Sequence, residues 1–191
     1  MVTASKANIK AIVAAALSCA AVLFSYGLTL EGIELALFAV ILVSAAAVDI
    51  ESRRIPNALV AAACVVRLAY LAILGLSGHP GVGSLAAGSL VGALAIGGGL
   101  LVATLVADRL LGGQNMGGGD IKLLAVVGLY FGVSAGVAVV LAACVLGVLS
   151  SRIFASPEAP GAPRTFPFGP SIAVASMLAM LVMSPLVILS L

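Results

Sequence analysis

Long runs of apolar residues, separated only by short polar stretches, constrain this chain more than any other feature. Residues 8–28, 57–76 and 84–107 are each about as long as the roughly 20 residues with which a helix crosses a membrane. Only 8% of the 191 residues are charged, whereas about a quarter are charged in a typical soluble domain. The buried core of a soluble domain does not account for so low a share of charged residues. Lipid must therefore surround most of this chain.

The apolar runs predict seven membrane segments, with turn residues or charges between them. They lie at residues 8–28, 33–49, 57–76, 84–107, 121–132, 135–151 and 171–191. The fifth is too short to cross as a straight lipid-facing helix and fits a short helix buried by its neighbours. Alternatively, the fifth and sixth form one broken helix, which would place the C-terminus on the other side. We predict an all-α polytopic membrane protein, a bundle of six to seven transmembrane helices with short loops, in a single domain over residues 1–191.

The first apolar segment, residues 8–28, has Lys6 before it and Lys10 near its start, and so resembles a signal peptide. Its apolar run continues through Phe24, however, and further membrane segments follow it. We interpret it as a retained extra helix that packs beside a motif-bearing bundle over residues 33–191. The stretch 150–170, with five prolines, is expected to form a cytoplasmic loop without secondary structure of its own.

The basic residues predict the orientation of the bundle in the cell membrane. With the N-terminus in the cytoplasm, all but one of the nine lysines and arginines fall on or near the cytoplasmic side. The outer loops then carry Glu31, Glu34 and His79 and no basic residue. The exception is Arg67, in the middle of the third segment. We expect Arg67 either to snorkel or to pair with an acid on a neighbouring helix, such as Asp108.

Several classes of function are disfavoured by what the chain lacks. The basic residues form no patch, so nucleic acid is not an expected partner. The three cysteines lie far apart with no C-x-x-C pair, which argues against a zinc or redox site. The sole histidine, His79, falls in the outer loop, away from the acids discussed next. No cofactor or metal is therefore expected. The spacing in "GSLVG", Gly88 to Gly92, indicates close packing of helix backbones.

Two carboxylates, Asp49 and Asp120, are the candidates for chemistry. Asp49 closes the second segment and Asp120 opens the fifth, so the predicted topology places both at the cytoplasmic boundary, where an unpaired acid is costly. For Asp120 helix capping is an alternative, although capping does not explain the glycines before it. Asp49 lies at the C-terminal end of its helix, where the helix dipole disfavours negative charge. A second carboxyl that shares one proton with it would explain its position and would provide an acid and a base over one water.

Three stretches resemble the type IV prepilin peptidase family, and most closely its short Tad-type members. "MGGGDIKLL" (116–124) is similar to the family's G-x-G-D-x-K-L motif, and "DIESRRIPN" (49–57) to its other aspartate motif. "FPFGPSIAVA" (166–175) resembles the proline-glycine segment before the last helix. The three matches follow the order of the family and span most of the chain. The cysteine pairs that larger bacterial members carry in an additional N-terminal region are missing here.

The resemblance implies a membrane-embedded aspartic endopeptidase without a cofactor. It would remove the short basic leader of prepilin-like membrane proteins at the cytoplasmic face, before their hydrophobic N-terminal helix. Because the cysteine pairs are missing, N-methylation of the product is not expected. The residues that the resemblance assigns to the site are the catalytic Asp49 and Asp120 and the motif positions Gly117, Gly119, Lys122, Arg53, Arg54, Pro56 and Asn57. The two glycines would admit substrate backbone, and the basic residues would either position loops or anchor in headgroups.

Three other classes of protein were compared with this hypothesis. A small proton-coupled transporter or channel would also carry intramembrane acids, but it predicts acids near the midplane and internal repeats. A presenilin-type protease would share only the G-x-G-D tetrapeptide. A non-catalytic scaffold would explain the glycines but not the two aspartates. The peptidase is the hypothesis that uses all three stretches.

Overall fold

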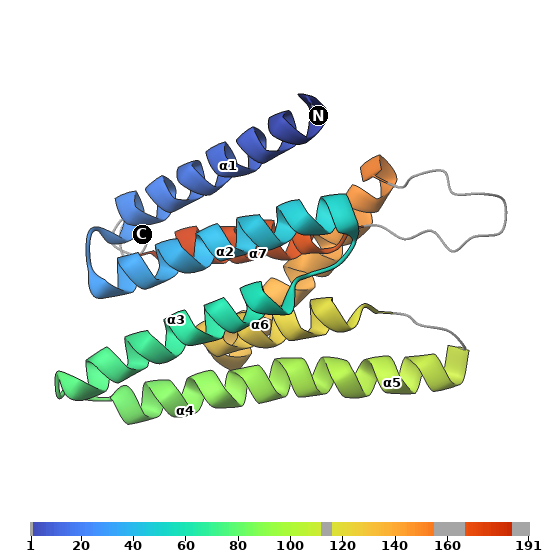
Figure 1. Ribbon diagram of the computed structural model, residues 1–191. Helices are drawn as coiled ribbons and strands as arrows, with labels where there is room; N and C mark the ends of the chain where they lie inside the picture. The colour runs from blue at the N-terminus through green and yellow to red at the C-terminus, as the bar shows by residue number, and fades with distance from the viewer. Residues whose placement is uncertain (1, 112–115, 155–166, 185–191) are drawn as a thin grey trace, which may run out of the picture.

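A computed structural model describes residues 2–111, 116–154 and 167–184, and these ranges are almost entirely helical. Figure 1 shows the helices lying roughly side by side as a bundle. Its elements are α1 (Val2–Tyr26), α2 (Leu30–Ser52), α3 (Asn57–Leu76), α4 (Val82–Ala93), the π-helical turn η1 (Leu94–Gly98), α5 (Gly99–Leu111), α6 (Gly118–Phe154) and α7 (Gly169–Val182). Five stretches are long and apolar enough to cross a membrane, and α7 is a shorter apolar helix. The predicted all-α polytopic membrane fold is confirmed.

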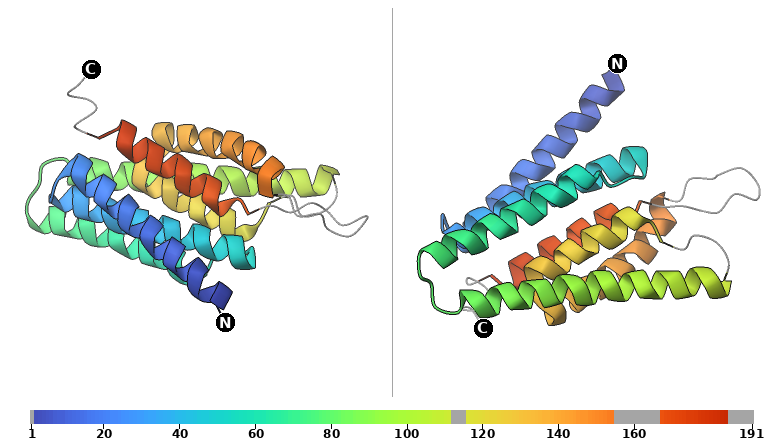
Figure 2. Two further views of the ribbon diagram at one scale, coloured as in Figure 1. Left: turned by 90° about the horizontal axis from the view of Figure 1, so that it is seen from above. Right: turned by 60° about the horizontal axis from the view of Figure 1, so that its bottom comes forward.

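The fifth and sixth predicted segments are the two halves of α6, which is broken at Gly132. Gly132 has φ 70° and ψ −166°, a backbone conformation that glycine adopts readily because it has no Cβ. Beyond it the chain folds back, since a Cβ on Gly136 would lie 3.5 Å from the Cα of Gly128. The left view of Figure 2 shows the second half running back toward the end of the bundle at which α6 begins. The first half, residues 118–131, spans only about 21 Å and is surrounded by protein on several sides.

The fold-back of α6 brings distant parts of the chain to one end of the bundle, which we call the motif end. It comprises the turn between α2 and α3, the start of α6 and the start of α7. The opposite end carries the turn between α1 and α2, where the Tyr26 hydroxyl donates to the carbonyl of Met180 at 2.9 Å. The central part of the proline-rich stretch and the end of the last predicted segment, residues 155–166 and 185–191, lie outside the described residues.

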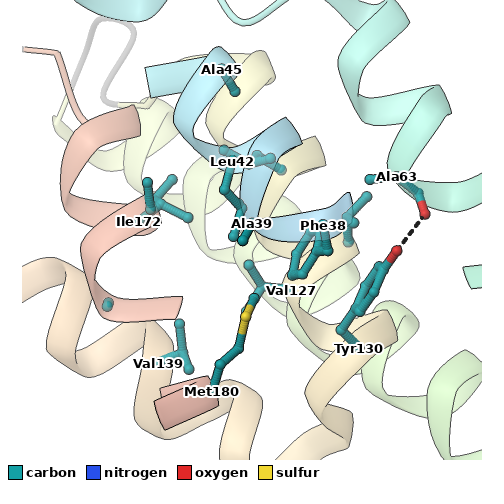
Figure 3. Packing of buried hydrophobic residues seen from close by; sticks show 14 of the residues in the cluster. Phe38, Ala39, Leu42, Ala45, Ala63, Val127, Tyr130, Val139, Ile172 and Met180 are labelled. Carbon is teal, nitrogen blue, oxygen red and sulfur yellow. Dashed lines mark hydrogen bonds between the residues drawn. The ribbon is translucent and has the colours of Figure 1, made fainter. Parts of the chain in front are cut away.

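Helix α1 lies at the periphery (Figure 1) and contributes one fully buried residue, Val22, to the core, while the other core residues follow later in the chain. Phe38 of α2 stacks on Tyr130 of α6, with ring centroids 3.7 Å apart and planes inclined by 8°. The Tyr130 hydroxyl donates to the carbonyl of Ala63 on α3 at 2.9 Å, as Figure 3 shows. This contact connects α2 and α6, the helices that carry the two aspartates, to α3.

Glycine allows close backbone contact between α4 and α6, as the G-x-x-x-G spacing predicted. Gly92 of α4 faces Gly128 of α6, and a Cβ on Gly92 would collide with the carbonyl of Gly128. A Cβ on Gly88, the other glycine of the pattern, would meet nothing within 4 Å, although its carbonyl oxygen lies 4.0 Å from the position of a Cβ on Gly132. A Cβ on Gly92 would also lie 2.7 Å from the Cα of Gly132, so the packing of α4 on α6 depends on Gly92 and on two glycines of α6.

Of the two alternatives for Arg67, pairing with an acid on a neighbouring helix is the one observed, but the acid is Glu34 rather than Asp108. Arg67 is buried and its Nη1 lies 3.0 Å from Oε1 of Glu34 on α2, while its Nη2 donates to Ser89 Oγ on α4 at 2.9 Å. Its guanidinium carbon also lies 5.4 Å from the ring centroid of Tyr130. Glu34 was predicted in an outer loop, and this was wrong, because α2 already begins at Leu30 and buries the side chain. A hydropathy pattern assigns a charged residue at the edge of an apolar run to a loop, because the sequence does not show that its partner lies on another helix.

We expect Arg67→Met to destabilise the bundle by about 3–5 kcal/mol, because Glu34 would be left buried without a partner. The double variant Glu34→Gln/Arg67→Met removes both charges and should recover most of that loss. Unfolding in detergent, followed by circular dichroism, measures both. Equal stability of Arg67→Met and the parent chain would show that the ion pair does not stabilise the fold.

Candidate active site

Asp49 lies in the last turns of α2 at the motif end, and only 5% of its surface is exposed. Its Oδ2 accepts a hydrogen bond from the backbone N–H of Gly169, the first residue of α7, at 2.8 Å. The helix ends at Arg53, whose φ of 52° is in the left-handed region and whose N–H donates to the carbonyl of Asp49. The C-terminal end of α2 disfavours a negative charge on Asp49, whereas the N-terminal end of α7 stabilises it.

Gly169 was not among the predicted site residues. A Cβ at this position would lie 2.9 Å from Asp49 Oδ2 and 3.0 Å from Asp49 Cβ, so only glycine fits without movement of Asp49. The sequence did carry a signal, a glycine between Phe168 and Pro170 at the start of the last apolar segment. That position is 120 residues from Asp49 along the chain, and its partner is not evident from the sequence.

Asp120 lies in the first turn of α6, also at the motif end, and is half-buried. Its carboxyl is within electrostatic range of Asp49. The helix that carries it begins two residues earlier, at Gly118, so the position is one at which the helix dipole favours an acid. The structure thus brings both predicted catalytic residues to one end of the bundle.

The motif glycines differ in the space around them. A Cβ on Gly117 would lie 3.1 Å from Asp120 Oδ2, and a Cβ on Gly119 would lie 3.2 Å from Ile55 Cβ. A Cβ on Gly118, between them, would meet nothing within 4 Å. Gly117 therefore leaves room for the Asp120 carboxyl, and Gly119 for the loop between α2 and α3. Their proposed role in admitting substrate remains a prediction.

The second motif forms the turn between α2 and α3. Ile55 is buried against Gly119, and Pro56 is the residue that precedes α3. Arg53 and Arg54 are exposed at this turn, where either loop positioning or headgroup anchoring remains open. Asn57 begins α3, and its Oδ1 accepts a hydrogen bond from Lys122 Nζ at 3.0 Å.

Lys122 and Asn57 thus connect the two aspartate motifs directly. Because the pair is exposed, we expect Lys122→Met to lower the free energy of unfolding by no more than about 1 kcal/mol. The contribution of the pair itself is measured by a double-mutant cycle of Lys122→Met with Asn57→Ala. A coupling energy of zero would show that the contact does not hold the motifs together.

The part of the chain that the structure describes contains no cluster of side chains suited to bind a metal ion, and its cysteines are not grouped. Within residues 2–111, 116–154 and 167–184, no three His, Cys, Asp or Glu side chains are grouped as metal ligands. Cys19, Cys64 and Cys144 are free thiols. His79 is exposed in the turn between α3 and α4, at the end opposite the aspartates. The expectation of a site without cofactor remains a prediction.

Comparison with known proteins identifies one family. The model of the type IV leader peptidase family matches residues 36–151, from α2 to the end of α6. The match includes both aspartates and the predicted site residues around them, and it leaves α1, the stretch 166–175 and α7 outside. No curated protein and no solved structure matches the chain.

Proposed function

Because the chain belongs to the type IV leader peptidase family, as the match over residues 36–151 shows, we propose that it removes the leader peptide of prepilin-like membrane proteins. The bond would be hydrolysed at the cytoplasmic face of the cell membrane by Asp49 and Asp120 acting on one water. The substrate would carry a basic leader followed by a hydrophobic helix.

One observation carries this proposal. Asp49 and Asp120 come from separate motifs, yet both lie at the motif end and interact electrostatically. Contacts between the motifs, Lys122 with Asn57 and Gly119 with Ile55, fix the segments that carry them. Two carboxyls in this relation provide one acid and one base without any nucleophilic side chain.

The motif end also suits the position of the bond to be cleaved. A leader lies in water and the helix that follows it lies in lipid, so the bond between them is at the membrane boundary. The two acids lie at helix termini, at α2's end and α6's start, rather than midway along the helices. This position supports a peptidase acting at the interface over a transporter, which would need acids near the midplane.

The proposal is tested with the purified protein in liposomes and a synthetic substrate that has a basic leader and an apolar helix. We expect mass spectrometry to show release of the leader and a free, unmethylated amino terminus on the product. The double variant Asp49→Asn/Asp120→Asn provides the inactive control. A substrate that stays intact with correctly folded protein, across several leader sequences, would contradict the proposed function.

A further inference from the structure

The first turn of α7 directs one hydrogen bond to Asp49. The first N–H groups of a helix have no partner within the helix. In α7, Pro170 has no N–H, and the next two N–H groups both donate to the carbonyl of Phe168. The N–H of Gly169 instead donates to Asp49 Oδ2 at 2.8 Å. Asp49 therefore caps α7 from another helix.

This contact acts on the charge of Asp49. Both groups are buried, so water does not compete strongly for the hydrogen bond. A hydrogen bond donated to an ionised carboxylate is roughly twice as strong as one between neutral groups. The positive end of the helix dipole of α7 adds to the same preference. The hydrogen bond and the helix dipole favour negative charge on Asp49, whereas burial of its carboxyl disfavours it.

Asp120 lacks a comparable donor. Among the described residues, no N–H or side chain donates a hydrogen bond to its carboxyl, although it lies within electrostatic range of Asp49. Two carboxyls that repel each other electrostatically do not ionise equally, and the negative charge belongs to the one that is better stabilised. We propose that the N–H of Gly169 is a positioning group that keeps Asp49 ionised, so that Asp49 is the general base and Asp120 the general acid. The inference rests on the proposed function and assigns the roles within it.

The proton transfers balance with this assignment. Asp49 takes a proton from water as the water oxygen bonds to the scissile carbonyl carbon, and Asp120 gives its proton to the carbonyl oxygen. The C–N bond then breaks, the proton held by Asp49 moves to the leaving nitrogen, and one hydroxyl proton of the tetrahedral intermediate returns to Asp120. Asp49 is again ionised and Asp120 again protonated at the end of the cycle.

The first test is Gly169→Ala, which pushes the Asp49 carboxylate away from the amide. We expect kcat for leader removal to fall about 10²-fold, the size of effect that a misplacement of about 1 Å produces, with KM unchanged. The acidic limb of the kcat profile should move to higher pH, because the base has lost its donor while the neighbouring Asp120 remains. Gly75→Ala in α3 is the control, since its Cβ would meet nothing within 4 Å.

A second variant removes the donor without adding an atom that could collide. In a semi-synthetic chain, glycolic acid replaces Gly169, so that an ester oxygen stands where the N–H was. The same fall in kcat and the same movement of the pH profile are expected, with the melting temperature near that of the parent chain. Unchanged kcat in this ester variant, or a fall without movement of the profile, would overturn the assignment. If the parent chain itself cleaves no prepilin-like substrate, the proposed function has failed instead.

Discussion

Replacing either Asp49 or Asp120 with asparagine is expected to reduce kcat for leader removal by about 10²–10⁴-fold, the contribution of a positioned acid or base. The asparagine side chain has nearly the same shape, but it neither accepts a proton from water nor donates an acidic one. The measurement is a time course of leader release by equal amounts of each variant in liposomes. If either asparagine variant releases the leader at the normal rate, the aspartate that it replaces takes no part in catalysis.

The fold is expected to survive the Asp49→Asn change. The amide oxygen of asparagine still accepts the hydrogen bond of Gly169, so α7 remains capped. Asp49→Leu should in addition cost about 1–3 kcal/mol, because the buried N–H would lose its partner. Comparing the two variants separates loss of chemistry from loss of structure.

A carboxyl close by in the same helix provides the matched control. Glu51 lies two residues beyond Asp49 and is exposed. Glu51→Gln removes one negative charge from the same end of α2 and should leave kcat unchanged. A comparable loss in Glu51→Gln would indicate that the net charge of this end, rather than the two aspartates, governs the rate.

Much of the fold could be predicted because lipid imposes a simple requirement on composition. The predicted third segment, residues 57–76, coincides with α3, and the break between the fifth and sixth falls at Gly132. The helices themselves run a few residues further than most predicted segments. Hydropathy marks the apolar part of a helix, whereas the hydrogen-bonded helix continues into the polar boundary.

Partners across the bundle could not be predicted in the same way. The position of Arg67 within an apolar run left two interpretations open, snorkelling or pairing with an acid such as Asp108, and Glu34 was not considered because it was assigned to an outer loop. Which acid is reached depends on how the helices are rotated about their axes, and packing decides that rotation. Gly169 was not predicted as a site residue for the same reason. Its role depends on how closely α7 packs against Asp49, and not on a side chain of its own.

Gly119→Val is expected to reduce kcat by about 10²-fold or more, through movement of the loop between α2 and α3. A Cβ on Gly119 would lie 3.2 Å from Ile55 Cβ and 3.5 Å from Ile55 N, and valine adds two methyl groups to it. Because Ile55 is buried, the side chain has little room to withdraw, and the turn that follows Asp49 must shift. The measurement is kcat for leader removal, with Gly118→Val as the control, because that Cβ would meet nothing within 4 Å.

The double variant Gly119→Val/Ile55→Ala distinguishes two reasons for the glycine. If Gly119 makes room for Ile55, shortening Ile55 relieves the collision and restores a large part of kcat. If Gly119 makes room for the substrate backbone, the valine still blocks the substrate and the double variant stays as slow as Gly119→Val. The contacts around Gly119 favour the first result. Wild-type kcat in Gly119→Val alone, or an equal loss in Gly118→Val, would contradict both explanations.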